Sequence, residues 1–204
     1  GAGASAWEAA GGGGAATLGE LTDVLLDVTQ FTDSLLIQTD SDGAAPTTGT
    51  LSSASDNIGI GAGTFSVLTS ANSNVVIGNG GAGAAISTAT QSTLIGNGAG
   101  AAVSTSSGNT LIGRNAGTTT TGSGNTVVGK NALYFNAGDT YNVAVGDRAG
   151  YFNTSGKNIF IGYKAAYANP AGTGDSNIVI GAQSVGTSAG AGEGNVALGQ
   201  GEHT

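Results

Sequence analysis

From residue 57 onward the chain repeats a short pattern of one polar residue, three mostly apolar residues and a glycine. The first copy is Asn57-Ile58-Gly59-Ile60-Gly61. The closing glycines of the nine copies are Gly61, Gly78, Gly96, Gly113, Gly129, Gly146, Gly162, Gly181 and Gly199. The steps between them are 17, 18, 17, 16, 17, 16, 19 and 18 residues. This near-constant period predicts a repeat architecture built by stacking.

The three residues before each closing glycine predict a β-strand. The residue directly before the glycine is always a large aliphatic, and the residue three positions before it is always β-branched. Both lie on one side of a strand, so we expect this pair to face a close-packed interior. The residue between them, such as Val76 or Phe160, is apolar in every copy or is Gly59. A strand that is apolar on both faces is expected to be buried on both.

The period limits what one coil can contain. About 17 residues give room for two short strands and two turns, but none for a crossover helix. The predicted fold is therefore all-β: a repeat solenoid, or parallel β-roll, with coils of about 17 residues. One apolar face fills the interior, and the second needs another surface. The simplest source of that surface is another copy of the chain, which predicts a homo-oligomer.

Two further positions of the repeat fit such a coil. The Asn four residues before the closing glycine, replaced by Ser92 in one copy, is expected to satisfy backbone groups of the turn and to stack as a ladder. The residue three positions after the glycine is always small, as at Ala99 and Ala116, which predicts a narrow second wall. The closing glycine permits a positive φ or a close backbone approach at the corner.

The first 56 residues follow other patterns. Residues 1–16 are almost all Gly and Ala around Trp7, which predicts a flexible lead-in. Apolar residues between 17 and 39 fit either a short helix or a pair of strands. The predicted division is thus a lead-in at 1–16, an N-terminal fibre or attachment module at 17–56, and a β-roll of nine repeats at 57–204.

The charge and composition of the chain exclude several kinds of partner. The net charge is −8, and residues 1–56 hold eight acids and no Lys or Arg, whereas the remainder holds five acids and five bases. With no basic face to neutralise phosphates, nucleic-acid binding is not expected. No apolar run approaches the roughly 18 residues of a membrane span, so membrane insertion is not expected either. The chain has no Cys, which excludes disulfides and thiolate metal sites.

Few residues of the chain are candidates for catalysis. The only histidine, His203, lies directly before Thr204 and has no evident nucleophile partner. The acids of the repeat region are Asp139, Asp147, Asp175, Glu193 and Glu202. They occupy different positions of different coils, without the repeated pairing that glycosidase chemistry requires. We therefore expect no enzyme activity, no catalytic residues, no metal site and no cofactor.

Aromatic residues form the most distinctive surface feature. Those that fall five or six residues after consecutive closing glycines are Tyr134, Phe135, Tyr151, Phe152 and Tyr167. Equal positions in successive coils predict that they stack along one edge, with Tyr163 in the same coils. Near them in sequence lie the bases Arg114, Lys130, Arg148, Lys157 and Lys164. The band predicts either a glycan-binding surface or an aromatic ladder that seals coil edges or an inter-subunit contact.

The repeat phrase resembles known proteins. Copies such as Gly124-Asn125-Thr126-Val127-Val128-Gly129 resemble the left-handed parallel β-roll repeats of trimeric autotransporter adhesin heads, and equally the Asn-Thr-x-Ile-Gly repeats of bacteriophage tail fibres. The stretch Leu18-Gly19-Glu20-Leu21-Thr22-Asp23-Val24 resembles a phrase common in phage tail-fibre and neck-appendage proteins. No heptad run typical of an adhesin stalk occurs, which favours the phage resemblance.

The resemblance implies a homotrimeric, non-enzymatic shaft of a phage tail or neck fibre, located in the virion. It also implies contacts with other tail or neck proteins through the N-terminal region, and contact with a host surface glycan or protein. The alternative is a trimeric adhesin head on a bacterial cell surface that binds host matrix or glycans. A polysaccharide depolymerase is a third and disfavoured interpretation, because paired carboxylates are missing.

Overall fold

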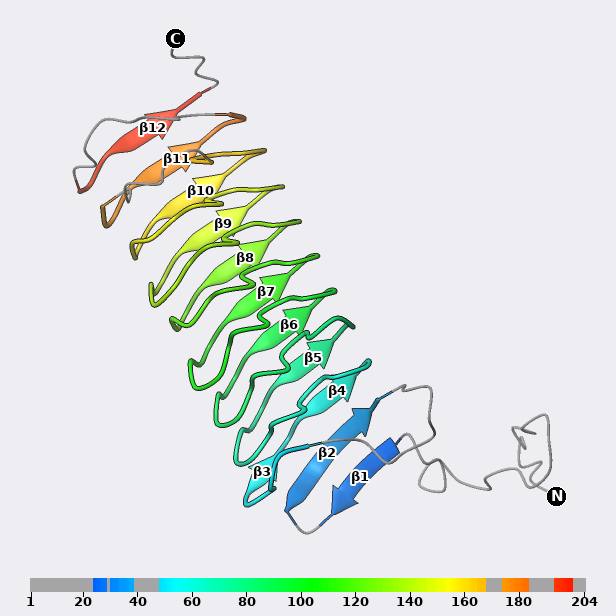
Figure 1. Ribbon diagram of the computed structural model, residues 1–204. Coiled ribbons are helices and arrows are strands. Elements are labelled where there is room, and N and C mark those ends of the chain that lie inside the picture. Colours follow the sequence, from blue (N-terminus) through cyan, green and yellow to red (C-terminus); the bar gives the residue numbers. More distant parts are fainter. Residues whose placement is uncertain (1–23, 29, 39–47, 168–173, 184–192, 200–204) are drawn as a thin grey trace, which may run out of the picture.

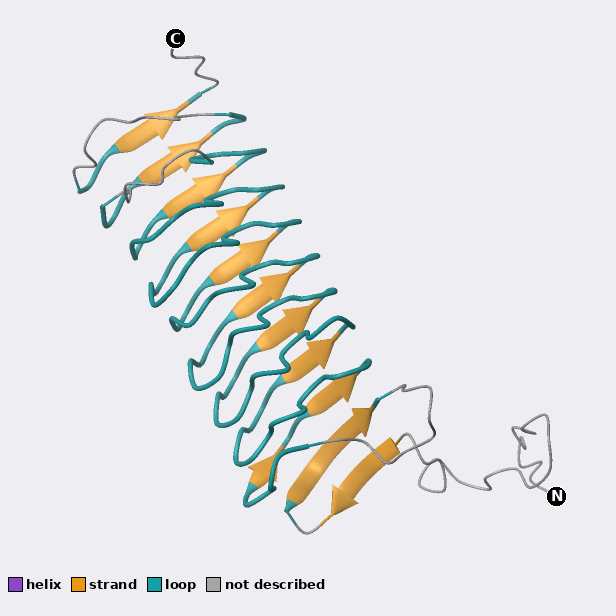
Figure 2. Cartoon of the chain, in the orientation of Figure 1, coloured by secondary structure: helices purple, strands orange, loops and turns teal. Residues whose placement is uncertain are grey.

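The computed structural model describes residues 24–28, 30–38, 48–167, 174–183 and 193–199. It is an elongated stack of coils joined by one sheet (Figure 1), and the described residues contain strands, turns and bends but no helix (Figure 2). The nine strands of the repeats are β4 (Ile58–Ile60), β5 (Val75–Ile77), β6 (Thr93–Ile95), β7 (Thr110–Ile112), β8 (Thr126–Val128), β9 (Val143–Val145), β10 (Ile159–Ile161), β11 (Ile178–Ile180) and β12 (Val196–Leu198). Each pairs in parallel with the next, in register. The predicted all-β parallel solenoid is confirmed.

The N-terminal end of the sheet is a hairpin. Strands β1 (Val24–Val28) and β2 (Phe31–Ile37) pair antiparallel, so the second of the two alternatives for this region holds. Strand β2 then pairs in parallel with β4, and the short β3 (Ala54–Ser55) also pairs with β2. Hairpin and coils therefore share one sheet. Trp7 and His203 lie outside the described residues.

The prediction of which strand face points inward was wrong. The middle residue of each strand faces the core: Val76, Leu94, Leu111, Val127 and Phe160 are all fully buried. The flanking residues point outward, and Ile58 and Ile77 are 41% and 37% exposed. A three-residue strand with three apolar side chains gives no polar position from which to assign the faces, so periodicity alone could not decide between them.

The core is packed by size complementarity across the coil. Gly59 lies opposite Phe65, whose ring would be only 2.6 Å from a Cβ at Gly59. The reverse holds at Phe160, where Gly150 leaves room for the ring and a Cβ would come within 2.5 Å of it. Large and small residues thus alternate between sheet and second wall, which keeps the interior at close-packed density.

Among the described residues each coil of the repeats contains one three-residue strand, although its length leaves room for two. The second wall consists of turns, with isolated parallel bridges from Ser55 to Asn72 and from Asn72 to Thr90. Backbone groups of this wall bond from coil to coil, as in Ser87 N to Ser104 O at 3.1 Å. Most of the small residues predicted for this wall are buried, Ala99 and Ala116 among them, whereas Gly81 is partly exposed.

The predicted asparagine ladder is confirmed. The side-chain Oδ1 of each ladder Asn accepts a hydrogen bond from the backbone N–H of the equivalent residue one coil further, for example Asn142 N to Asn125 Oδ1 at 2.9 Å. Ser92 continues the ladder with its hydroxyl, which accepts from Asn109 N at 3.2 Å. The ladder also reaches the hairpin, because Ser34 Oγ accepts from Asn57 N at 2.8 Å. A buried column of polar side chains thus fixes the register of the coils.

The closing glycines have the conformation that their position requires. Gly129 has φ 146°, and a Cβ there would lie 2.3 Å from the carbonyl oxygen of Gly146 in the next coil. Any other residue would therefore force the two coils apart at this corner.

Candidate functional site

The outward side of the sheet is an aliphatic surface, here called the outer face. It consists of two rows of side chains, one on each side of the buried middle residues. The rows are Ile58, Val75, Thr93, Thr110, Thr126, Val143, Ile159, Ile178 and Val196, and Ile60, Ile77, Ile95, Ile112, Val128, Val145, Ile161, Ile180 and Leu198. All are partly or largely exposed in the single chain, and only three of them are polar. A continuous apolar patch of this kind marks an interaction surface.

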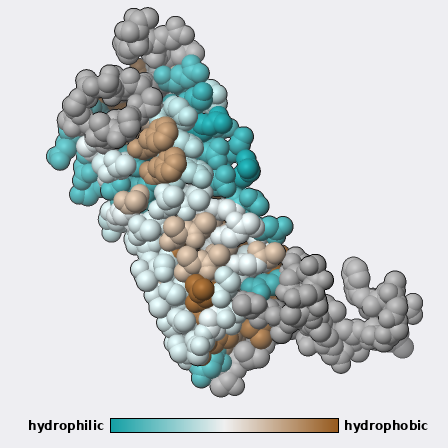
Figure 3. All heavy atoms as spheres, in the orientation of Figure 1, coloured by the Kyte–Doolittle hydropathy of each residue, from teal (hydrophilic) through white to brown (hydrophobic). Residues whose placement is uncertain are grey.

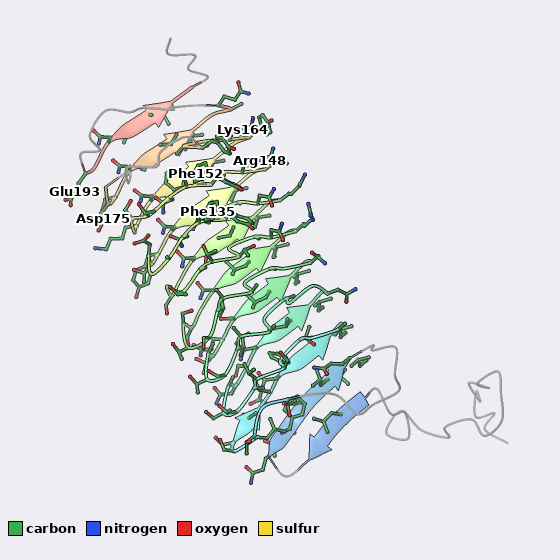
Figure 4. The ribbon with its side chains drawn as sticks, in the orientation of Figure 1. Phe135, Arg148, Phe152, Lys164, Asp175 and Glu193 are labelled. Atoms are coloured by element: carbon green, nitrogen blue, oxygen red, sulfur yellow. The ribbon has the colours of Figure 1, made fainter. Side chains whose placement is uncertain are left out.

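The aromatic ladder, made of Tyr134, Phe135, Tyr151, Phe152 and Tyr167, lies on the second wall and forms as predicted. Tyr134 and Tyr151 stack with ring centroids 5.2 Å apart and an interplanar angle of 15°. Phe135 and Phe152 stack at 5.4 Å and 3°. The phenylalanines show as a hydrophobic patch toward the C-terminal half of the stack, and further hydrophobic patches lie nearer the N-terminal end (Figures 3 and 4).

Ring stacking determines which parts of the ladder are accessible. Parallel rings one coil apart cover each other's faces, whereas a sugar ring packs on an aromatic face. The outward edges of the rings remain accessible, and Phe135 is 42% exposed. Burial within the stack raises the pKa of the Tyr151 phenol above its ordinary value, and Tyr134 and Tyr167 add to this while Arg148 opposes it. The geometry supports a sealing or contact role more directly than a sugar platform.

Tyr163 lies apart from the stack, at the corner that follows β10, and is 45% exposed. The Lys164 ammonium is 5.2 Å from the centroid of its ring and 5.3 Å from that of Tyr167. Lys164 therefore links Tyr163 to the ladder through two cation–π contacts. Arg148 lies at the same edge of the stack as Lys164, and Asp175 and Glu193 lie at the other (Figure 4). Arg148 also contacts Asp147 at 3.4 Å, a partly exposed ion pair of little energetic weight.

The coils with the aromatic ladder also differ inside, which the sequence reading missed. In the second wall, a buried residue lies seven or eight positions after the closing glycine and, in most coils, donates its backbone N–H to the carbonyl three residues earlier; we call this the wall position. Its occupants are Leu68, Ile86, Val103, Thr120 and Asn153, with Asn136 at the same place in its coil. All are at most 1% exposed. The side chain therefore changes from aliphatic to polar along the stack; aligning the repeats by their period shows the change, but not that the position is buried.

The two features are adjacent in sequence. Ala101-Ala102-Val103 in one coil corresponds to Tyr151-Phe152-Asn153 three coils later. Small residues outside and an aliphatic residue inside are thus replaced by aromatic residues outside and an amide inside. Apolar surface has been moved from the interior to the exterior of these coils.

Polar groups in the interior between β6 and β9 are incompletely satisfied. Among the described residues, six buried side-chain polar atoms have no hydrogen-bond partner, and five belong to Ser106, Thr120, Asn136, Asp139 and Asn142. These five residues, here called the polar interior, lie in three consecutive coils. Burial raises the pKa of the Asp139 carboxyl above its ordinary value, and Asp175 adds to the effect.

The other chemical candidates stay separate. Asp175 Oδ1 accepts a hydrogen bond from Gly156 N at 3.0 Å, and Glu193 is exposed. Glu202, like His203, falls outside the described ranges. Within those ranges no group of three or more His, Cys, Asp or Glu side chains is placed to hold a metal ion. They also include no helix long and apolar enough to cross a membrane.

Comparisons with known proteins give no relative. No protein-family model, no curated protein and no solved structure matches the chain. The fold and its surfaces define the class of the protein as a parallel β-solenoid with one aliphatic face and one aromatic ladder.

Proposed function

We propose that the chain is a non-enzymatic structural module of a phage tail or neck fibre, assembled as a homotrimer through the outer face. The observation that carries the proposal is the pair of aliphatic rows along the whole sheet, from Ile58 to Leu198. The strands of the repeats are parallel, and parallel sheets normally have both faces covered. A face that stayed in water would be expected to carry polar residues, and this one does not. Covering such a face with copies of the chain removes it from water and makes the stack rigid.

The two surfaces lie on different walls of the solenoid, which suits a fibre. Packing through the sheet buries the outer face and leaves the second wall, with the aromatic ladder, available for other contacts. The N-terminal region is then the part that contacts other tail or neck proteins of the virion. Three copies presented together also increase the avidity of any weak contact.

Light scattering on the purified chain at micromolar concentration tests the proposal. A trimer has a mass close to three times 19.4 kDa. The double variant Ile77→Lys/Val128→Lys places two charges on the outer face and is expected to give monomers that keep the strand signal in circular dichroism. The matched control Thr88→Lys/Thr105→Lys alters two exposed residues outside the strands and should stay trimeric. A wild-type chain that remains monomeric contradicts the proposal.

A second candidate is a surface adhesin head that binds host matrix or glycans. The comparison of coils favours it, because coils with aromatic residues on the exterior have an amide in the interior where other coils have an aliphatic side chain. The bases near the ladder suit an acidic sugar chain, since residues 114–167 hold five bases and two acids. Binding of immobilised acidic polysaccharide by the wild type, reduced at least tenfold in Tyr151→Ala/Lys164→Ala, supports it. Equal binding by both proteins counts against it.

A further inference from the structure

The polar interior contains groups that the protein itself leaves without partners. Thr120, Asn136 and Asn142 are fully buried, and Thr120 Oγ1, Asn136 Oδ1 and Asn142 Nδ2 have no hydrogen bond. Asp139 Oδ2 is likewise buried without a partner, although its residue is partly exposed. Leaving several such atoms unsatisfied in one place would cost more than a folded protein normally tolerates.

The asparagine at the wall position explains why the ladder is disturbed here. In a coil with an aliphatic wall position, the ladder amide has its own carbonyl, as in Asn74 Nδ2 to Ala89 O at 2.8 Å. Ala89 lies three residues before the next ladder residue, Ser92, and the equivalent carbonyl for Asn142 is that of Ser155, three residues before Asn158. That carbonyl already accepts from Asn153 Nδ2 at 2.6 Å and from Asn158 Nδ2 at 3.2 Å. Asn142 Nδ2 is therefore left over.

Reorienting the amides does not remove the problem. Asn142 Oδ1 accepts from Asn158 N at 2.9 Å, so its amide orientation is fixed and Nδ2 is a donor. Asn136 Nδ2 donates to the Asp139 carbonyl at 3.5 Å, and the flipped amide would set two acceptors against each other. The Asp139 carbonyl also accepts from Asn125 Nδ2 at 3.1 Å. The orphan atoms thus include one defined donor, two acceptors and the hydroxyls of Thr120 and Ser106.

We propose that the polar interior is a bound-water site, in which ordered water molecules bridge Asn142 Nδ2, Asn136 Oδ1, Asp139 Oδ2 and Thr120 Oγ1. Water can accept from the Asn142 amide and donate to the two oxygens in the same site. A buried water typically makes about three such bonds. A hard cation fits less well, because it would meet the amide donor and a single carboxylate where such ions prefer several oxygen ligands.

The site has a structural consequence. At the wall position, the coils around β8 and β9 are joined by hydrogen bonds through water, whereas the coils around β5 and β6 are joined there by aliphatic contact. The water site and the aromatic ladder then meet in the coil that contains Tyr134, Phe135 and Asn136.

A high-resolution crystal structure of the full chain is the first test. Density at hydrogen-bond distance from Asn142 Nδ2 and Asn136 Oδ1 is the expected result. A dry interior in which these atoms bond to protein groups overturns the proposal, and so does density at the shorter distances of cation coordination, about 2.3–2.6 Å for calcium.

Solution NMR gives a second test that does not depend on crystals. Magnetisation transfer from long-lived water to the side-chain amide of Asn142 is expected in the wild type. It should be lost in the double variant Thr120→Val/Asn136→Leu, which restores the aliphatic wall position of the other coils, and kept in Thr88→Val, which changes an exposed residue. Absence of this transfer in the folded wild type contradicts the proposal.

Discussion

The coils around β5 and β6 and those around β8 to β10 have the same backbone but are stabilised differently. Both have the asparagine ladder, the small residues of the second wall and the closing glycines. The first group fills the wall position with Ile86 and Val103, and the second with Asn136 and Asn153. In the second group the aromatic ladder stacks on the exterior of the same segment.

The difference shows which parts of the repeat are required and which are adjustable. The ladder and the corner glycines recur throughout because they satisfy backbone groups and allow the close approach of coils. The wall position tolerates an amide only where polar partners or water accompany it. Aromatic stacking outside then supplies part of the stabilisation that the interior has lost, at roughly 0.5–1.5 kcal/mol per ring pair beyond burial.

Placing an amide at the wall position of a coil whose interior is otherwise aliphatic should have the largest effect on stability. Val103→Asn buries an amide among aliphatic side chains and is expected to lower the free energy of unfolding by about 3 kcal/mol. Urea denaturation followed by circular dichroism measures it. Thr105→Asn, at an exposed position two residues away, should change stability by less than about 0.5 kcal/mol. Equal effects of the two substitutions would mean that the wall position is not a core position.

Removing the exterior support should affect the second group next. Tyr151 contacts four rings of the ladder, and its centroid lies 5.2 Å from those of both Tyr134 and Tyr167. Tyr151→Ala is therefore expected to cost about 2 kcal/mol. Tyr141 is 64% exposed and makes no ring contact of this kind, so Tyr141→Ala serves as the control. Thermal unfolding of both variants decides whether the ladder or any surface tyrosine stabilises the stack.

Two buried threonines should respond differently to the same substitution. Thr64 Oγ1 donates to Gly61 O at 3.0 Å, whereas Thr120 Oγ1 has no hydrogen-bond partner among the described residues and is proposed to bond to water. Thr64→Val is expected to destabilise the chain by about 1 kcal/mol, and Thr120→Val by less than about 0.5 kcal/mol, because it removes a bond to water and not a bond to a protein group. Paired urea titrations measure the difference. If Thr120→Val is the more destabilising of the two, the Thr120 hydroxyl has a partner that matters.

The sequence predicted the repeat, the strand in each coil, the asparagine ladder and the aromatic stacking, because each depends on equal positions in successive coils. It failed on the inward face of the strand, where all three residues are apolar. Variation at the middle position, from Gly59 to Phe160, is explained by Phe65 and Gly150 across the core. Such pairs join different positions of the repeat, which a search for equal positions does not compare.

The polar interior was missed for a related reason. The signal was present in the change from Val103 to Thr120, Asn136 and Asn153 at equal positions. In a chain with many Asn and Thr residues, however, this change is indistinguishable from ordinary turn residues until burial is known. Competition for the Ser155 carbonyl depends on distances between coils and could not be read from spacing.

The smallest expected difference between the two groups of coils is in how their stability depends on pH. The coils around β8 to β10 contain a partly buried carboxyl, that of Asp139, whereas the coils around β5 and β6 contain none. Burial raises the pKa of Asp139 in the folded chain above its unfolded value, so the folded state binds this proton more tightly. The resulting stability is fully present below the unfolded pKa and is lost as pH rises through the folded pKa. Asp139→Asn removes this dependence. The urea midpoint, measured from acid to neutral pH, should therefore fall less steeply with rising pH in the variant than in the wild type. Parallel curves would show that Asp139 is as well solvated in the folded chain as in the unfolded one.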